Sequence, residues 1–216
     1  MAGNILIIAL VVADQQLHTP MYFFLGNLSC LETCYASTIL PRMLAILQTG
    51  DRTISVNSCF VQYYSFGGLL AAECYLLSEM SYDRYLAICK PLHYGTLMNG
   101  RFCLQLAVGS WISSFVIVGM FTYLISQLTF CGHNEVDHFF CEFTALLKLS
   151  CSDTYLVELM AFIVASVDTF SPFLLTLASY IFIVATILRI PTTTGKQKAF
   201  STCSSHFIVH PSTGLL

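Results

Sequence analysis

The chain has 216 residues, of which 56% are apolar and 10% are charged, with a mean hydropathy of +0.73 and a formal net charge of -3 at pH 7. Soluble domains carry roughly 25% charged residues, so this chain lacks the polar shell that a globular core of its size needs. The small net charge gives no reason to expect nucleic acid as a partner, and abundant Phe, Tyr, Ile and Leu exclude disorder. The composition predicts a membrane protein.

Apolar segments long enough to be helices follow one another along the chain. A bilayer-spanning helix needs about 20 mostly apolar residues. The first segment, residues 1–13, is too short and is interpreted as the second half of a span. A signal peptide is the alternative, but it needs a basic start, and the first Lys or Arg is Arg42. We expect one domain over residues 1–216, with approximate spans 1–13, 21–47, 55–88, 101–124, 155–189 and 198–216.

The basic residues predict the orientation of these spans. Most of them form two clusters, which lie on the same side if the spans alternate: Arg84, Lys90 and Arg101, then Arg189, Lys196 and Lys198. Basic flanks stay in the cytoplasm. We therefore expect the Asp83-Arg84 end of the third span to face the cytosol, and the loop over residues 125–153 to face outward.

The ten cysteines agree with that orientation. Because the exterior is oxidising, four of them can pair there, with three possible connectivities: Cys59, Cys131, Cys141 and Cys151. We expect free thiols at the others: Cys30, Cys34, Cys74, Cys89, Cys103 and Cys203. A metal site that uses His133 and His138 is the alternative for the loop, but the C-x-x-C spacing typical of zinc sites is absent.

Asp83 and Arg84 end a long apolar segment and allow two interpretations. An Arg at a cytosolic helix end can extend to the interface and simply anchor the topology. Alternatively, the pair is a switch that a cytosolic protein opens on binding. The spacing of the two residues does not decide between these interpretations.

Several longer motifs resemble those of the odorant receptors, a family of rhodopsin-like G-protein-coupled receptors. Residues 80–89, MSYDRYLAIC, are similar to the family's M-A-Y-D-R-Y-V-A-I-C, and residues 17–25, LHTPMYFFL, match its first inner loop. Further matches are GN at 3–4, PRML at 41–44, HFFC at 138–141, LKLSCSDT at 147–154, SY at 179–180 and KAFSTCSSH at 198–206. The resemblance covers nearly all of residues 3–207.

The resemblance implies an all-α bundle of seven membrane helices that is not an enzyme. Its ligand would be a small, hydrophobic odorant, and its partner a stimulatory heterotrimeric G protein that raises cyclic AMP. Asp83, Arg84 and Tyr85 would form the inner switch, toward which Tyr180 swings on activation. The expected location is the plasma membrane of olfactory neuron cilia.

The resemblance also implies pairings and ligands for particular residues. The disulfides would be Cys59–Cys141 and Cys131–Cys151. Glu32 and Glu73 lie near the family's sodium pocket, so we expect them to bind sodium or, alternatively, to be protonated and hydrogen-bonded. The residues expected at odorant depth are Phe66, Gly67, Leu70, Ala71, Val164, Ala165 and Asp168. Asp168 would bind an amine or hydroxyl, or else bond to a neighbouring helix.

The chain also departs from the family pattern. Glu79 and Ser81 replace residues that are usually small or apolar, and Glu79 lies four residues before Asp83, which puts two acids on one helical face. The start of the first span, most of the sixth and all of the seventh are expected to be missing, which predicts a product that stays in the endoplasmic reticulum and does not signal. A small transporter or channel subunit is the alternative function, although the internal repeats typical of transporters are absent.

Overall fold

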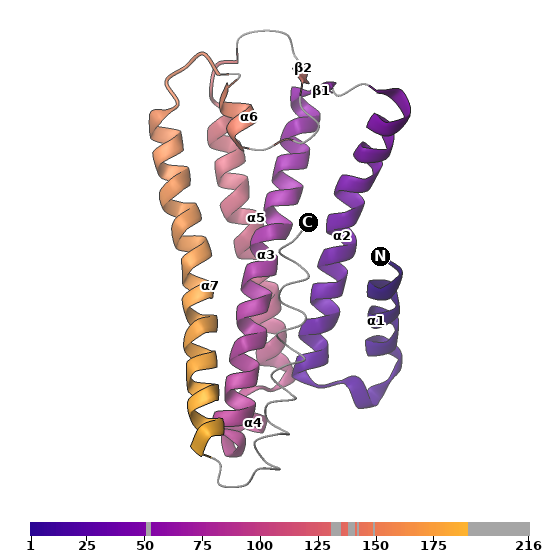
Figure 1. Ribbon diagram of the computed structural model, residues 1–216, viewed down its shortest axis with the longest axis vertical. Coiled ribbons are helices and arrows are strands. Elements are labelled where there is room, and N and C mark those ends of the chain that lie inside the picture. The colour runs from indigo at the N-terminus through magenta and orange to yellow at the C-terminus, as the bar shows by residue number, and fades with distance from the viewer. Residues whose placement is uncertain (51–52, 131–134, 138–140, 142, 149, 190–216) are drawn as a thin grey trace.

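The computed structural model of the chain describes residues 1–50, 53–130, 135–137, 141, 143–148 and 150–189. Long helices run side by side along the long axis of the molecule, and α3 lies in contact with α2, α5 and α7 (Figure 1). The elements are α1 (Ala2–Ala13), the short 3-10 helix η1 (Gln15–Leu17), α2 (Pro20–Thr49), β1 (Thr53–Ser55), α3 (Val56–Cys89), α4 (Pro91–Leu97), α5 (Gly100–Ser126), β2 (Glu135–Asp137), α6 (Phe143–Lys148) and α7 (Tyr155–Arg189).

Local sequence signals explain where the long helices begin and end. The side chain of Ser55 accepts a hydrogen bond from the backbone N–H of Ser58 and caps α3, and Asn99 accepts one from Phe102 and caps α5. Gly50 ends α2 with φ of 71°, a left-handed conformation that glycine adopts without a steric penalty. The five long or apolar helices match the expected segments to within two residues, and the segment 198–216 lies outside the described residues.

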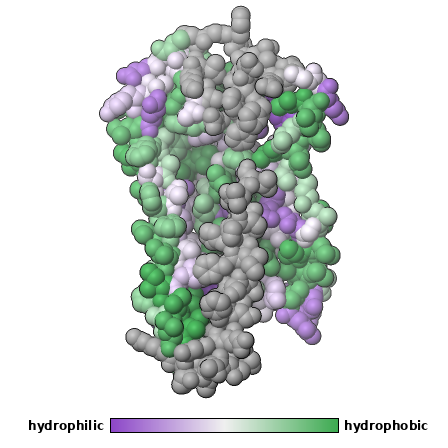
Figure 2. All heavy atoms as spheres, in the orientation of Figure 1, coloured by the Kyte–Doolittle hydropathy of each residue, from purple (hydrophilic) through white to green (hydrophobic). Residues whose placement is uncertain are grey.

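Three of the described helices, α2, α5 and α7, are long and apolar enough to cross a membrane, and α1 is a shorter apolar helix. The 34-residue α3 is long enough but more polar, because it carries Glu73, Glu79, Asp83 and Arg84. Its central position explains how it tolerates them, since neighbouring helices and not lipid surround its buried face. On the face shown in Figure 2, hydrophobic residues cover much of the flanks of the bundle.

Tight packing between α3 and its neighbours forms the core. Apolar side chains from three helices are buried together, among them Phe24 and Leu28 of α2, Leu76 of α3 and Cys103 of α5. Nearer the N-terminus of α3, Gly68 allows the backbone of α3 to approach α5 closely. A Cβ at this position would lie 2.7 Å from the ring of Phe115. Small residues at helix contacts are typical of membrane bundles.

Three short helices, η1, α4 and α6, and two short strands were not expected. β1 pairs antiparallel with β2, in the register Thr53 with Asp137 and Ser55 with Glu135. This small sheet lies at the same end of the bundle as α6, while α4 lies at the opposite end (Figure 1). The all-helical prediction is therefore correct for the bundle, and the strands belong to the connections at one of its ends.

Candidate functional site

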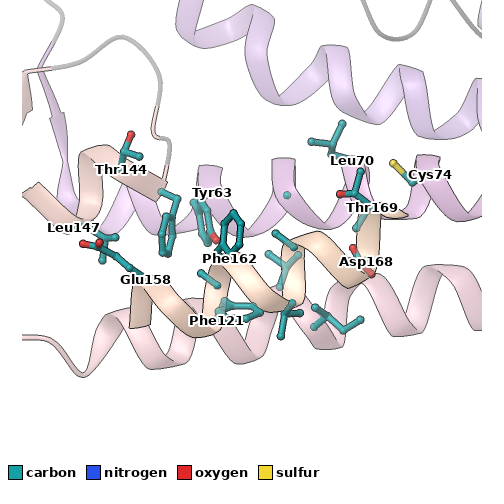
Figure 3. Close-up of a pocket in the computed structure, with 18 of the residues that line it drawn as sticks. Tyr63, Leu70, Cys74, Phe121, Thr144, Leu147, Glu158, Phe162, Asp168 and Thr169 are labelled. Carbon is teal, nitrogen blue, oxygen red and sulfur yellow. The ribbon is translucent and has the colours of Figure 1, made fainter. Parts of the chain in front are cut away.

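A cavity of about 940 Å³ lies between α3, α5, α6 and α7. Its volume is within the range of about 300–1,000 Å³ typical of small-molecule sites. Figure 3 shows side chains from these four helices converging on it. The lining residues are Tyr63, Gly67, Leu70, Ala71, Cys74, Ile117, Val118, Phe121, Phe143, Thr144, Leu147, Thr154, Glu158, Ala161, Phe162, Val164, Ala165, Asp168 and Thr169.

Every residue expected at odorant depth lines this cavity except Phe66. The ring of Phe66 lies 4.7 Å from the ring of Tyr35, so it faces α2 instead. Gly67, the next residue, does face the cavity, because successive residues on a helix point about 100° apart. The bundle thus brings the α3 and α7 members of the predicted set together around one space.

Asp168 is the acid nearest the middle of α7 in this cavity, and its carboxylate accepts a hydrogen bond from the hydroxyl of Tyr75 on α3. The sequence left two roles open for Asp168, a ligand contact or a bond to a neighbouring helix. The bond to Tyr75 is a contact of the second kind. At the other end of the cavity, Glu158 accepts a bond of 2.7 Å from Thr154. Figure 3 shows Glu158 beside Leu147, and Asp168 farther along α7 near Thr169.

A disulfide ties the outer end of α3 to the segment that leads into α6. Cys59 and Cys141 are bonded, and both are fully buried. This pairing was expected and is confirmed. Because α6 starts two residues after Cys141, the bond holds Phe143 and Thr144 over the cavity. Cys151 is also disulfide-bonded, while its expected partner, Cys131, lies outside the described residues.

Five of the remaining cysteines are free thiols, as expected. These are Cys30, Cys34, Cys74, Cys89 and Cys103, and Cys203 lies outside the described residues. His133 and His138, the alternative metal ligands, lie outside them too. Among the residues that the structure describes, no group of three or more His, Cys, Asp or Glu gathers to hold a metal.

A second polar cluster lies at the inner end of α3. Asp83 is 1% exposed, accepts a hydrogen bond of 2.8 Å from the Tyr94 hydroxyl, and lies 3.9 Å from the Nε of Arg84. Burial and the hydrogen bond to Asp83 raise the pKa of Tyr94, which lies on α4 outside the spans. Next to this cluster, Tyr85 and Tyr180 pack against Ile183. The structure thus places all four predicted switch residues at one end of the α3–α7 contact.

A family model described as olfactory receptor matches residues 1–210. The chain belongs to the olfactory receptor family. Olfactory receptor 6F1 of Homo sapiens is 50% identical over 208 residues, which make up 96% of this chain and 68% of that relative. Olfactory receptor 5AR1 of Mus musculus is 49% identical over 204 residues, or 94% of this chain and 66% of the relative.

Family membership decides several expectations. Olfactory receptors are seven-transmembrane, G-protein-coupled receptors and not enzymes, as the motifs predicted. The chain spans about two thirds of the length of the curated relatives that it matches. A transporter or channel subunit, the alternative function, has no support in these matches.

The two glutamates expected to bind sodium lie on neighbouring helices of this olfactory receptor chain. Glu32 of α2 accepts a hydrogen bond of 2.7 Å from the Asn4 side chain of α1. Glu73 of α3 is buried, with 8% of its surface exposed. The contact with Asn4 is a feature that the sequence did not suggest, and it joins α1 to α2.

Glu79, where the chain departs from the family pattern, contacts α5. Its Oε1 accepts a hydrogen bond of 2.5 Å from the hydroxyl of Ser110. Its Oε2 is buried and has no hydrogen-bond partner within the part of the chain that the structure describes. Asp83, one turn later, bonds instead to Tyr94. The two acids thus have different partners on different helices, which reduces the effect of their like charges.

Sequence reasoning missed many residues of these sites, among them two on α3 that line the cavity and two tyrosines that hold acids. Tyr63 and Cys74 line the cavity with Gly67 and Leu70, and the spacings of three and four residues between them are the signal that places all four on one helical face. Tyr75 and Tyr94 hold Asp168 and Asp83, respectively. No sequence pattern could pair them with these acids, because their side chains meet only when separate helices pack.

Proposed function

We propose that this odorant receptor binds a small, mostly apolar odorant in its cavity and engages a stimulatory heterotrimeric G protein at its inner face to raise cyclic AMP, and that the 216 residues by themselves bind the odorant without signalling. One observation carries the proposal: α3 lines the cavity with Gly67 and Ala71 and ends in the Asp83–Arg84 cluster. A ligand that contacts one end of this helix can bias the other, provided that it binds the two receptor states with different affinity.

The cavity fits an odorant through shape and dispersion. Most of its lining side chains are apolar, and several are as small as Gly67, Ala161 and Ala165. Small side chains on facing helices leave the volume that a ligand then fills. Phe121 and Phe162 supply broad apolar faces, from α5 and α7, respectively.

The inner cluster supports a role in G-protein contact. Among the residues that the structure describes, the Nη2 of the Arg84 guanidinium is buried and has no hydrogen-bond partner. A buried, unpaired donor of this kind is costly, and the C-terminal helix of a Gα subunit would supply acceptors for it. Tyr85 and Tyr180 flank the same position and complete the proposed switch.

Sodium bound by Glu32 and Glu73 is part of the proposal. The two acids lie on the contacting helices α2 and α3, and a cation would supply the counter-charge that carboxylates inside a helix bundle need. Sodium should therefore raise the melting temperature of the detergent-purified chain more than potassium does, and Glu32→Gln and Glu73→Gln should each remove the difference. An equal sodium effect in all three proteins would contradict this site.

The family and the apolar helices favour the plasma membrane, and we propose olfactory neuron cilia as the site of action. Immunostaining of olfactory epithelium with an antibody against the chain tests whether the protein is located in the cilia. Signal confined to cells outside that epithelium would contradict it.

Two native thiols report on the two proposed sites. Cys74 lines the cavity, and Cys89 lies at the inner end of α3, where it contacts Thr186. The 216-residue chain in lipid nanodiscs is treated with a small, uncharged methanethiosulfonate, and mass spectrometry locates the modified cysteines. We expect hexan-1-ol or hexyl acetate to slow modification of Cys74, and a peptide of the C-terminal helix of a stimulatory Gα subunit to slow modification of Cys89.

Matched controls separate binding from general effects. Cys30, exposed on α2 and absent from the cavity lining, should react at the same rate with and without odorant. Arg84→Gln should remove the protection of Cys89 by the peptide, and a scrambled peptide should give none. Unchanged Cys74 rates with every odorant tested would contradict the cavity as the odorant site.

A further inference from the structure

The cavity has a marked charge asymmetry. Its lining contains two carboxylates, Asp168 and Glu158, and none of the lining residues that the structure describes is a Lys, Arg or His. Within the same described part of the chain, neither acid forms an ion pair, since the recorded salt bridge joins Arg84 and Asp83. The cavity therefore presents negative charge without a matching cation in its walls.

Asp168 keeps unused hydrogen-bonding capacity. A carboxylate has about four acceptor positions on its two oxygens, and the Tyr75 hydroxyl takes one of them, on Oδ1. The residue is half-buried and lies beside Thr169 and Cys74 at the end of the cavity away from α6 (Figure 3). Tyr75 thus orients the carboxylate and leaves the rest of it for a ligand.

We propose that this receptor selects odorants with an amine group, whose ammonium binds Asp168 while the hydrocarbon part lies among the apolar residues of the cavity. The inference rests on the proposed function, because it names the ligand class of the same cavity. Charge-assisted hydrogen bonds are roughly twice as strong as neutral ones, and the ammonium supplies the counter-charge that the walls lack. A carboxylic acid of the same length is disfavoured, because it brings a second negative charge.

Glu158 plays a secondary part in this proposal. It is exposed, and its Oε1 already accepts from Thr154 near the start of α7. It lies ten residues before Asp168, or about 15 Å along the helix axis. A short amine bound at Asp168 does not reach it, so Glu158 contributes negative potential at the mouth of the cavity and not a contact.

Four probes with the same six-carbon chain test the proposal: hexylamine, hexan-1-ol, hexyl acetate and hexanoic acid. The readout is protection of Cys74 from the methanethiosulfonate in the 216-residue chain, measured as the concentration that halves the rate. We expect hexylamine to protect at a concentration at least about tenfold lower than hexan-1-ol, a difference of about 1.4 kcal/mol, and hexanoic acid to protect least.

Two variants test whether Asp168 binds the ammonium group or serves only as a structural contact for Tyr75. Asp168→Asn retains an oxygen that accepts from Tyr75 but removes the charge, so it should remove the advantage of hexylamine and leave protection by hexan-1-ol unchanged. Glu158→Gln should change the hexylamine concentration by less than about threefold, which is about 0.65 kcal/mol. The intact Cys59–Cys141 disulfide, measured by mass spectrometry, confirms that each variant is folded.

Three other outcomes would contradict the amine selectivity, and one of them would also contradict the odorant site. If hexan-1-ol or hexyl acetate protects Cys74 as well as hexylamine does, the cavity binds odorants but the amine selectivity is wrong. Equal protection by hexylamine in the wild type and in Asp168→Asn also overturns the selectivity. If none of the four probes protects Cys74, both the selectivity and the proposed odorant site fail.

Discussion

The two halves of α3 differ in how completely they are packed. Along its outer half, Gly67 and Ala71 face Ala161 and Ala165 across a cavity. Along its inner half, larger side chains fill the space against α2 and α5: Leu76, Leu77, Met80 and Leu86. The same helix therefore forms a binding space where its side chains are small, and a rigid core where they are large.

The polar groups follow the same division. The outer acid, Asp168, is half-buried and faces the cavity, and of the described residues Tyr75 is the one that donates a hydrogen bond to it. The inner acid, Asp83, is 1% exposed and is held by Tyr94 and Arg84. The outer acid thus has acceptor capacity for a ligand, while the inner acid is held by side chains of the protein.

Removing the outer disulfide should have the largest effect on this contrast. Cys59→Ser combined with Cys141→Ser releases α6 from α3 and should cost about 2–4 kcal/mol of stability. The melting temperature in detergent should fall, and Cys74 should react faster because α6 no longer covers the cavity. Cys30→Ser, at an exposed free thiol, is the control. Unchanged Cys74 reactivity would show that α6 does not depend on this bond.

Filling the close contact between α3 and α5 should have the next largest effect. Gly68→Val adds atoms where a Cβ already lies 2.7 Å from Phe115, and overpacking of this kind costs about 1–3 kcal/mol. Gly109→Ala in α5 is the matched control, since no described atom lies within 4 Å of its added Cβ. This variant should stabilise the folded chain by about 0.5–1 kcal/mol. Melting temperatures that move in the same direction would contradict the packing.

On the inner side, Ser110→Ala removes the donor to Glu79. Because the Oε2 of Glu79 already lacks a partner, its carboxyl would be left without any hydrogen bond, at a cost of about 1–3 kcal/mol. Ser113→Ala, three residues along α5, removes only a 3.3 Å bond to a backbone carbonyl and should shift the melting temperature less. Equal shifts for the two variants would mean that the bond to Glu79 contributes nothing.

Tyr94→Phe should have the smallest effect, about 1 kcal/mol, through loss of its bond to Asp83. Because the pKa of Tyr94 is raised by burial and by Asp83, its contribution is complete below the ordinary tyrosine pKa of about 10 and is lost as the pH rises above it. The difference in melting temperature between wild type and variant should therefore stay constant from about pH 7 to 9. A difference that shrinks within that range would contradict the raised pKa.

The helices and one disulfide could be predicted from the sequence because they depend on local composition and on long motifs. Runs of apolar residues in 101–124 and 155–189 match α5 and α7 closely, and the resemblance paired Cys59 with Cys141 correctly. The short strands β1 and β2 could not be predicted, since each has three residues and forms only against the other.

For the sites, the sequence by itself determined which helical faces carry small or ionisable residues: a regular helix places residues three and four apart on one face. The family resemblance then predicted Gly67 and Asp168 at the cavity, and the basic clusters predicted Asp83 with Arg84 at the inner end. Only the tertiary structure decided that Tyr75 holds Asp168, that Tyr94 holds Asp83, and that Phe66 faces α2. The physical reason is that the rotation and depth of one helix against another are decided by the packing of side chains far apart in sequence.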